Sequence, residues 1–134
     1  MIPEKTITIC GKEVGMIYCA ATENGYEDLA NKSISVFVPE FGKDDDGNDI
    51  IVKPAEAHIG DFVMLAIAGI IAYYAKNKQN VPVETEEIIY ESSSAERNEM
   101  IATIVELRNE WYKVPSVVKP DMKPDGRRGK SKNG

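Results

Sequence analysis

Apolar and polar residues alternate in two short runs near the start of the chain, and this pattern predicts a β-hairpin. The runs flank Gly11-Lys12, and glycine at the first central position of a two-residue loop suits a type II′ turn. In that register Ile9 pairs with Val14 and Ile7 with Met16, so one face of the hairpin is apolar. Because a lone hairpin is only marginally stable in water, we expect this face to pack on the rest of the chain.

The longest run of apolar residues is Phe62–Ala75, which predicts a central helix. We expect this helix to begin at Pro54, where proline suits the first turn, to continue through Asp61 and to end near Lys78. The run of 14 residues is shorter than the ~20 that a bilayer requires, so a membrane span is not expected. A helix that is apolar on all sides must be surrounded. Either its own domain buries it, or another chain covers part of it.

The segment between the hairpin and the central helix is predicted to hold a short helix and a surface loop. The short helix covers 20–31, with three residues on its inner side: Ala21, Tyr26 and Leu29. Residues 33–38 are predicted to be extended, and 42–49 to form a polar loop at the surface.

Two further helices are predicted after the central one. The first covers Thr85–Tyr90, with Thr85 as its N-cap and Ile88 and Ile89 inside. Ser93 and Glu96 match a capping box, which opens a longer amphipathic helix that ends near Lys113. Its inner residues are Met100, Ile104, Leu107 and Trp111, flanked by Ile101, Val105 and Tyr112. Its outer residues are Glu99, Thr103, Glu106 and Glu110.

These elements predict a mainly α fold of the α+β class, in which an N-terminal β-hairpin packs on a small bundle of about four helices. Residues 1–118 are expected to form a single globular domain, followed by a basic, disordered tail over 119–134. The domain has 10 Lys and Arg against 20 Asp and Glu, a net charge of −10, whereas the tail has 6 against 2, a net charge of +4. An acidic domain argues against duplex nucleic-acid binding, which depends on neutralising phosphates.

Candidate chemistry is sparse along the sequence. Aligning Asp44, Asp46 and Asn48 to a calcium loop puts Asp49 where glycine is required, so we interpret this segment as a solvated turn. His58 is the only histidine and has no neighbouring metal ligand or catalytic partner. Cys10 and Cys19 lie too far apart in the hairpin for a disulfide and are expected to be free thiols. We therefore expect no catalytic residue, no metal site and no cofactor.

The candidate protein-binding residues are apolar and aromatic side chains of the two long helices. Small residues on the central helix would let another backbone approach closely, and aromatic residues dominate interface energetics. Burial in the domain core is the alternative for each of them, above all for Trp111. The set is Phe62, Leu65, Gly69, Ala72, Tyr73, Trp111 and Tyr112.

The order of these motifs resembles that of phage tail assembly chaperones. In that family a Gly-Lys-Glu hairpin, here Gly11–Glu13, leads to a small helix that closes on a Gly/Asn-Lys-Ser-Ile turn, here Asn31–Ile34. An Ala-rich apolar helix follows, here Ala66–Tyr73, and Thr85–Ile88 and Ile104–Leu107 match later motifs in type and order. Two features depart from the family pattern: the long loop Phe41–Pro54 and the basic tail.

The resemblance implies a non-enzymatic protein of phage or prophage origin that acts in the host cytoplasm. It would coat the tape measure protein, recruit tail-tube subunits, and be absent from the finished virion. Self-association is a further possibility within this family. A different class of function remains open: a small regulatory adaptor whose basic tail contacts nucleic acid or an acidic protein.

Overall fold

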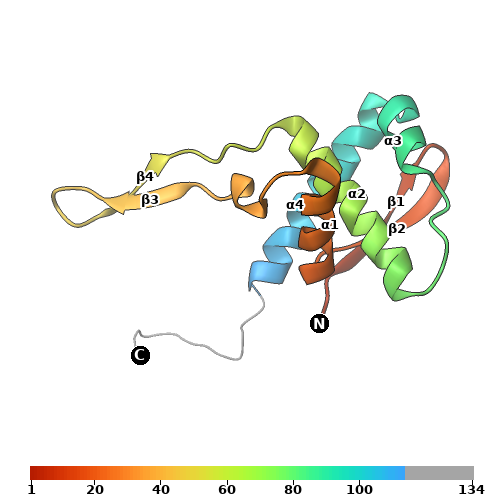
Figure 1. Cartoon of the computed structure of the whole chain (residues 1–134), viewed down its shortest axis with the longest axis horizontal. Helices are drawn as coiled ribbons and strands as arrows, with labels where there is room; N and C mark the ends of the chain where they lie inside the picture. The colour runs from red at the N-terminus through yellow and green to blue at the C-terminus, as the bar shows by residue number, and fades with distance from the viewer. Residues whose placement is uncertain (114–134) are drawn as a thin grey trace.

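Helix α2 (Ile59–Lys76) runs through the centre of the protein, and the other elements are arranged around it (Figure 1). The structure is a computed structural model that describes residues 1–113. It contains four helices and two antiparallel hairpins, which confirms the predicted α+β class. The other elements are β1 (Glu4–Ile9), β2 (Lys12–Ile17), α1 (Ala20–Ala30), the 3-10 turn η1 (Ile34–Phe37), β3 (Glu40–Lys43), β4 (Asp49–Lys53), α3 (Thr85–Glu91) and α4 (Ser94–Lys113). The predicted end of the domain at 118 and the tail 119–134 lie outside the described residues.

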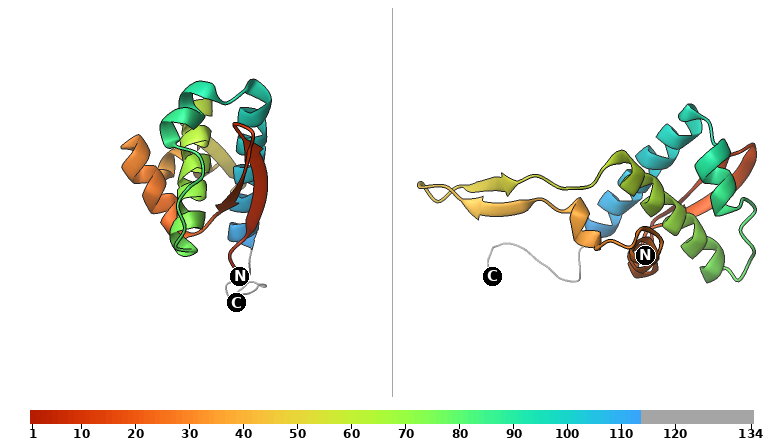
Figure 2. Two further views of the ribbon diagram at one scale, coloured as in Figure 1. Left: turned by 90° about the vertical axis from the view of Figure 1, so that its right-hand side faces the viewer. Right: turned by 45° about the horizontal axis from the view of Figure 1, so that its top comes forward.

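The central helix packs against α1 on one side and against the β1–β2 hairpin and α4 on the other (Figure 2). Its approach to β2 depends on two glycines. A Cβ added to Gly69 would lie 2.7 Å from the carbonyl oxygen of Ile17, and a Cβ added to Gly15 would lie 2.4 Å from the ring of Tyr73. The backbone N–H of Gly15 also donates to the hydroxyl of Tyr74 at 3.1 Å.

The length and composition of α2 would allow it to cross a membrane, but half of the helix is buried inside the domain. The core helix of a soluble domain meets the same criteria of length and composition. Burial inside its own domain is therefore the arrangement that the structure shows for much of this helix.

The first hairpin forms, but its register differs from the predicted one by two residues. Ile7 pairs with Val14, and the two central turn residues are Cys10 and Gly11 rather than Gly11 and Lys12. Both have positive φ, 51° and 76°, as a type I′ turn requires. A shift of two residues preserves which side chains share a face, so the predicted apolar face is buried as expected.

The segment that leads into α2 differs more from the prediction. Residues 34–37 form a 3-10 turn instead of an extended strand, and α2 begins at Ile59 rather than at Pro54. His58 is the N-cap residue, and the Asp61 carboxylate accepts its backbone N–H, which fixes the start of the helix there. In α1, Tyr26 is buried as predicted, whereas Ala21 and Leu29 are exposed.

The two C-terminal helices match the prediction in position. The capping box of α4 is present: Ser93 Oγ accepts the N–H of Glu96 at 3.1 Å, and Glu96 Oε1 accepts the N–H of Ser93 at 3.0 Å. Thr103, predicted on the outer face, is buried. In α3 the N-cap is Glu84 rather than Thr85, and Ile89 is partly exposed while Ile88 is buried.

Candidate protein-binding site

The segment Glu40–Lys53, named here the arm, projects away from the helical body as a second hairpin (Figures 1 and 2). Its side chains are exposed along both strands, and only Gly42 is partly covered. Four of the exposed residues are large and apolar: Phe41 (62% exposed), Ile51 (59%), Val52 (56%) and Ile50 (39%). The predicted polar loop over 42–49 is thus the turn and part of the strands of an apolar hairpin.

The apolar residues of the arm lie on both of its faces. Phe41 pairs with Ile51, so these two side chains share one face. Gly42 pairs with Ile50, and a Cβ added to Gly42 would lie 2.9 Å from Val52 Cγ1, so Ile50 and Val52 share the other face. Neither face packs on the body, although a two-stranded hairpin is only marginally stable in water. Exposed apolar patches of this kind mark sites of protein interaction.

Local hydrogen bonds close the turn at the tip of the arm. Asp44 Oδ1 accepts the N–H groups of Asp46 and Asn48 at 3.0 and 2.8 Å, and the carbonyl of Asp44 accepts the N–H of Gly47. Gly47 has a φ of 84°, which glycine adopts without strain. Asp44 therefore serves to close a turn.

The base of the arm is anchored to the body. The carbonyl oxygen of Val36 accepts the N–H groups of Glu56 and Ala57 at 3.0 and 2.9 Å, which ties the chain after β4 to η1. Phe37, at the end of η1, packs between the rings of Tyr26 and Phe62, with ring centroids 5.0 Å from each. The body thus holds the base of the arm and leaves its strands free.

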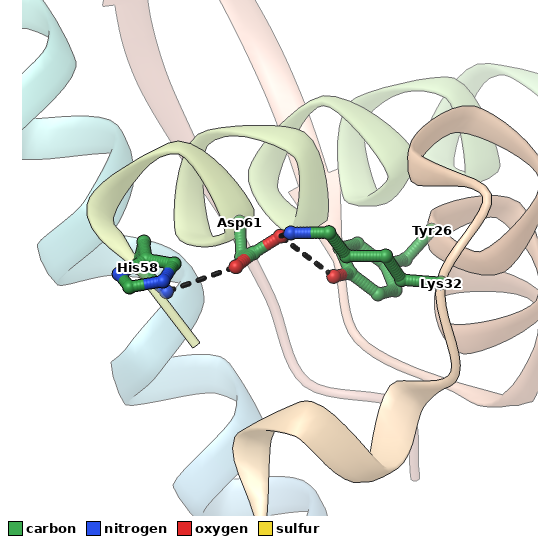
Figure 3. Close-up of polar contacts among 4 residues, drawn as sticks. All are labelled: Tyr26, Lys32, His58 and Asp61. Atoms are coloured by element: carbon green, nitrogen blue, oxygen red, sulfur yellow. Dashed lines mark hydrogen bonds and ion pairs between the residues drawn. The ribbon is translucent and has the colours of Figure 1, made fainter. Parts of the chain in front are cut away.

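A buried carboxylate, that of Asp61, completes this anchor (Figure 3). Asp61 Oδ1 accepts the hydroxyl of Tyr26 at 2.9 Å and pairs with Lys32 Nζ at 3.0 Å, while Oδ2 accepts the N–H of His58 at 2.9 Å. Burial would raise the pKa of Asp61, but the hydrogen bonds from His58, Lys32 and Tyr26 together outweigh it and lower that pKa. Burial, followed by the bond to Asp61, raises the pKa of Tyr26 to about 12. All three donors serve to fix the start of α2.

A groove of about 840 Å³ lies beside the base of the arm. Its polar side chains include Lys32, Lys53, Glu56 and His58, of which Lys53 and Glu56 form an ion pair at 2.8 Å. Over residues 1–113 no group of three or more His, Cys, Asp or Glu side chains is placed to hold a metal ion.

The structure places the predicted binding residues of α2 in or beside the core. Leu65, Gly69 and Ala72 are buried by the protein itself and present no surface to a partner in this conformation. Phe62 and Tyr73 are half-buried, the first against Phe37 and the second over Gly15.

The predicted pair on α4 has two different environments. Trp111 is half-buried and packs on a cluster that includes Ile17 and Ala72, as expected for the core alternative. Tyr112 is 59% exposed, but its hydroxyl donates to the carboxylate of Glu23, which ties the end of α4 to α1. Arg108 lies over the ring of Tyr112, with its guanidinium carbon 5.1 Å from the centroid. The structure therefore does not gather the predicted residues into one exposed surface.

The arm was missed as a binding element, although the sequence contains a signal for it. Asp46-Gly47 is a strong hairpin-turn dipeptide, and it lies between Phe41–Lys43 and the β-branched run Ile50–Val52. The three aspartates at its tip are more typical of a polar loop than of an apolar hairpin.

Comparison of the chain with protein families, with curated proteins and with solved structures gave no match. The basic tail on which the adaptor alternative depends lies outside the described residues. The exposed apolar arm, held at its base by a closed body, is thus the feature of residues 1–113 that bears most directly on function.

Proposed function

We propose that this protein is a non-enzymatic phage tail assembly chaperone that binds its client through the apolar faces of the arm. The proposal rests on the pair of uncovered faces, Phe41 with Ile51 and Ile50 with Val52, on a hairpin whose side chains are exposed along both strands. The resemblance of the hairpin, helix and turn motifs to tail assembly chaperones supplies the class of client.

The client in this proposal is the tape measure protein, which is long and helical. Such a protein exposes apolar stripes until the tail tube surrounds it, and a chaperone must cover them. The arm offers apolar side chains on a base that is already fixed, so binding requires little ordering of the body. The chaperone would act in the host cytoplasm, recruit tail-tube subunits, and leave before the virion is complete.

Co-expression with a tape measure protein tests the proposal. We expect the two to co-purify and the client to stay soluble. The double variant Phe41→Thr/Ile51→Thr keeps residues that suit a strand but removes one apolar face, so it should lower the affinity by about tenfold or more.

The matched control changes two exposed apolar residues outside the arm. Ile89 and Tyr90 on α3 are 37% and 82% exposed, and the variant Ile89→Thr/Tyr90→Thr should bind the client as the unchanged protein does. Equal loss of binding in both variants, or no complex with the unchanged protein, would reject the proposal.

A further inference from the structure

Among residues 1–113, no strand pairs with the outer edge of β4. The N–H of Asp44 donates to the carbonyl of Asn48 at 3.0 Å, so this pair lies at a hydrogen-bonded position of the ladder. Hydrogen-bonded and non-bonded pairs alternate along an antiparallel ladder. It follows that Asp49 and Ile51 direct their backbone N–H and C=O groups away from β3, toward the free edge.

The residues along this edge are self-complementary in the antiparallel direction. β4 reads Asp49-Ile50-Ile51-Val52-Lys53, with an acid at one end, a base at the other and three apolar residues between them. Two copies aligned antiparallel about Ile51 place Asp49 of each opposite Lys53 of the other. The same alignment places Ile50 opposite Val52 and Ile51 opposite Ile51.

We propose that β4 is an interaction edge for a second copy of this chain, which pairs with it antiparallel about Ile51. The outward backbone groups of the two Ile51 residues supply the hydrogen bonds at the centre of this alignment. Because the bulge at Val52 pairs Lys53 with Glu40 of its own arm, the contact between Asp49 and Lys53 of the two copies is one between side chains. The two arms then form one four-stranded sheet, which is more stable than a lone hairpin. Because Phe41 pairs with Ile51 within each arm, Phe41 and Ile51 of both copies form one continuous apolar row on a single face.

The edge of β3 is the poorer candidate. It follows Pro39, which has no backbone N–H to donate, and it offers only one large apolar residue, Phe41.

A bulge shortens the regular edge of β4. Phe41 pairs with Ile51 and Glu40 with Lys53, so Val52 has no partner of its own and the regular edge is Asp49–Ile51. The pairing is therefore short, and the dimer is expected to be weak.

Disulfide trapping tests the alignment. In the proposed pair the two Ile51 Cα atoms lie about 5.5 Å apart, within the range for a disulfide. An Ile51→Cys variant, in a Cys10→Ser background with buried Cys19 retained, should form a covalent dimer under mild oxidation.

The matched control is Phe41→Cys in the same background. Phe41 is as exposed as Ile51 and lies on the same face, but the two copies of residue 41 would lie three strand spacings apart, roughly 14 Å. We expect Ile51→Cys to cross-link about tenfold faster or more, because residue 41 lies beyond the reach of a disulfide. Equal rates, or no dimer from Ile51→Cys, would overturn the proposal.

A charge swap tests the same pairing without a covalent bond. Asp49→Lys and Lys53→Asp each place like charges opposite one another at two symmetric positions, so each should weaken dimerisation about fivefold by sedimentation equilibrium. The double variant should recover it. Within one copy Asp49 pairs with Lys43 and Lys53 with Glu56, and both pairs stay broken in the double variant, so recovery can come only from contacts between copies. A double variant no better than the single ones, or a monomer at every concentration, would refute the pairing.

These measurements use no client. A failure to bind the tape measure protein would leave the trapped dimer unaffected, and a chain that binds its client as a monomer would reject only the pairing.

Discussion

At the scale of single residues, the packing of α2 depends on a glycine at position 69. A Cβ there would lie 2.7 Å from a backbone oxygen of Ile17, which cannot move aside as a flexible side chain would. We expect Gly69→Ala to lower the free energy of unfolding by about 1–3 kcal/mol, measured by urea denaturation.

Gly60 provides a matched control on the same helix. A Cβ added to Gly60 would have no neighbouring atom within 4 Å. Gly60→Ala should therefore leave the free energy of unfolding unchanged or raise it by about 0.5–1 kcal/mol. Similar losses for the two variants would contradict the role given to the contact with Ile17, because a Cβ at position 60 makes no such contact.

Asp61 is the second residue on which the body depends. Its carboxylate accepts three donors in a buried position, and we expect Asp61→Asn to cost about 2 kcal/mol of unfolding free energy at neutral pH. Hydrogen bonds lower the folded pKa of Asp61 below its ordinary 3.8, so its contribution is complete above 3.8 and is lost as the pH falls through the folded value.

The measurement is the stability of both proteins by urea denaturation from neutral pH down to the acid range. The difference between the unchanged protein and Asp61→Asn should shrink as the pH falls, whereas exposed Asp28→Asn on α1 should show little difference at any pH. A difference that stays constant with pH would contradict the assigned role of the carboxylate.

At the scale of elements, the arm and the body should be energetically separate. Because the strands of the arm bury no apolar surface on the body, replacing 41–52 with a short Gly-Ser linker should change the unfolding free energy by less than about 1 kcal/mol. Thermal and urea unfolding would measure this.

Ile88→Ala calibrates the same assay. Ile88 on α3 is buried, and its truncation should cost about 2–4 kcal/mol. A loss of that size on removing the arm would show that the arm is part of the folded core.

The elements differ in how far the sequence could predict them, and the difference follows the range of the interactions. The start of α4 depends on the contact between Ser93 and Glu96, three residues apart, and was predicted. The start of α2 has a contact of the same spacing, from the N–H of His58 to Asp61, but Asp61 is also held by Tyr26 and Lys32 from a different part of the chain, and this start was not predicted.

The same reasoning applies to the candidate site. The central apolar run has no polar face, so its periodicity could not separate core residues such as Leu65 from a partner-facing surface. The register of β1 and β2 was missed by two residues because positive φ at Cys10 has no marker in the sequence, whereas the alternation correctly identified the buried face.

At the scale of the whole molecule, the body buries a core and exposes apolar residues at scattered positions such as Ile59 and Tyr90, whereas the arm exposes four close together. Most apolar side chains of the central run are buried inside the body, whereas Phe41 and Ile50–Val52 are exposed. We propose that partners bind the arm and that α2 serves as the scaffold.

Hydrogen–deuterium exchange of the full chain, alone and with a tape measure protein as the proposed client, is the test of this division of roles. We expect fast exchange across 40–53 in the free protein, clear protection of that segment in the complex, and unchanged protection across α2. Protection gained on α2, with the arm exchanging as fast as before, would contradict it.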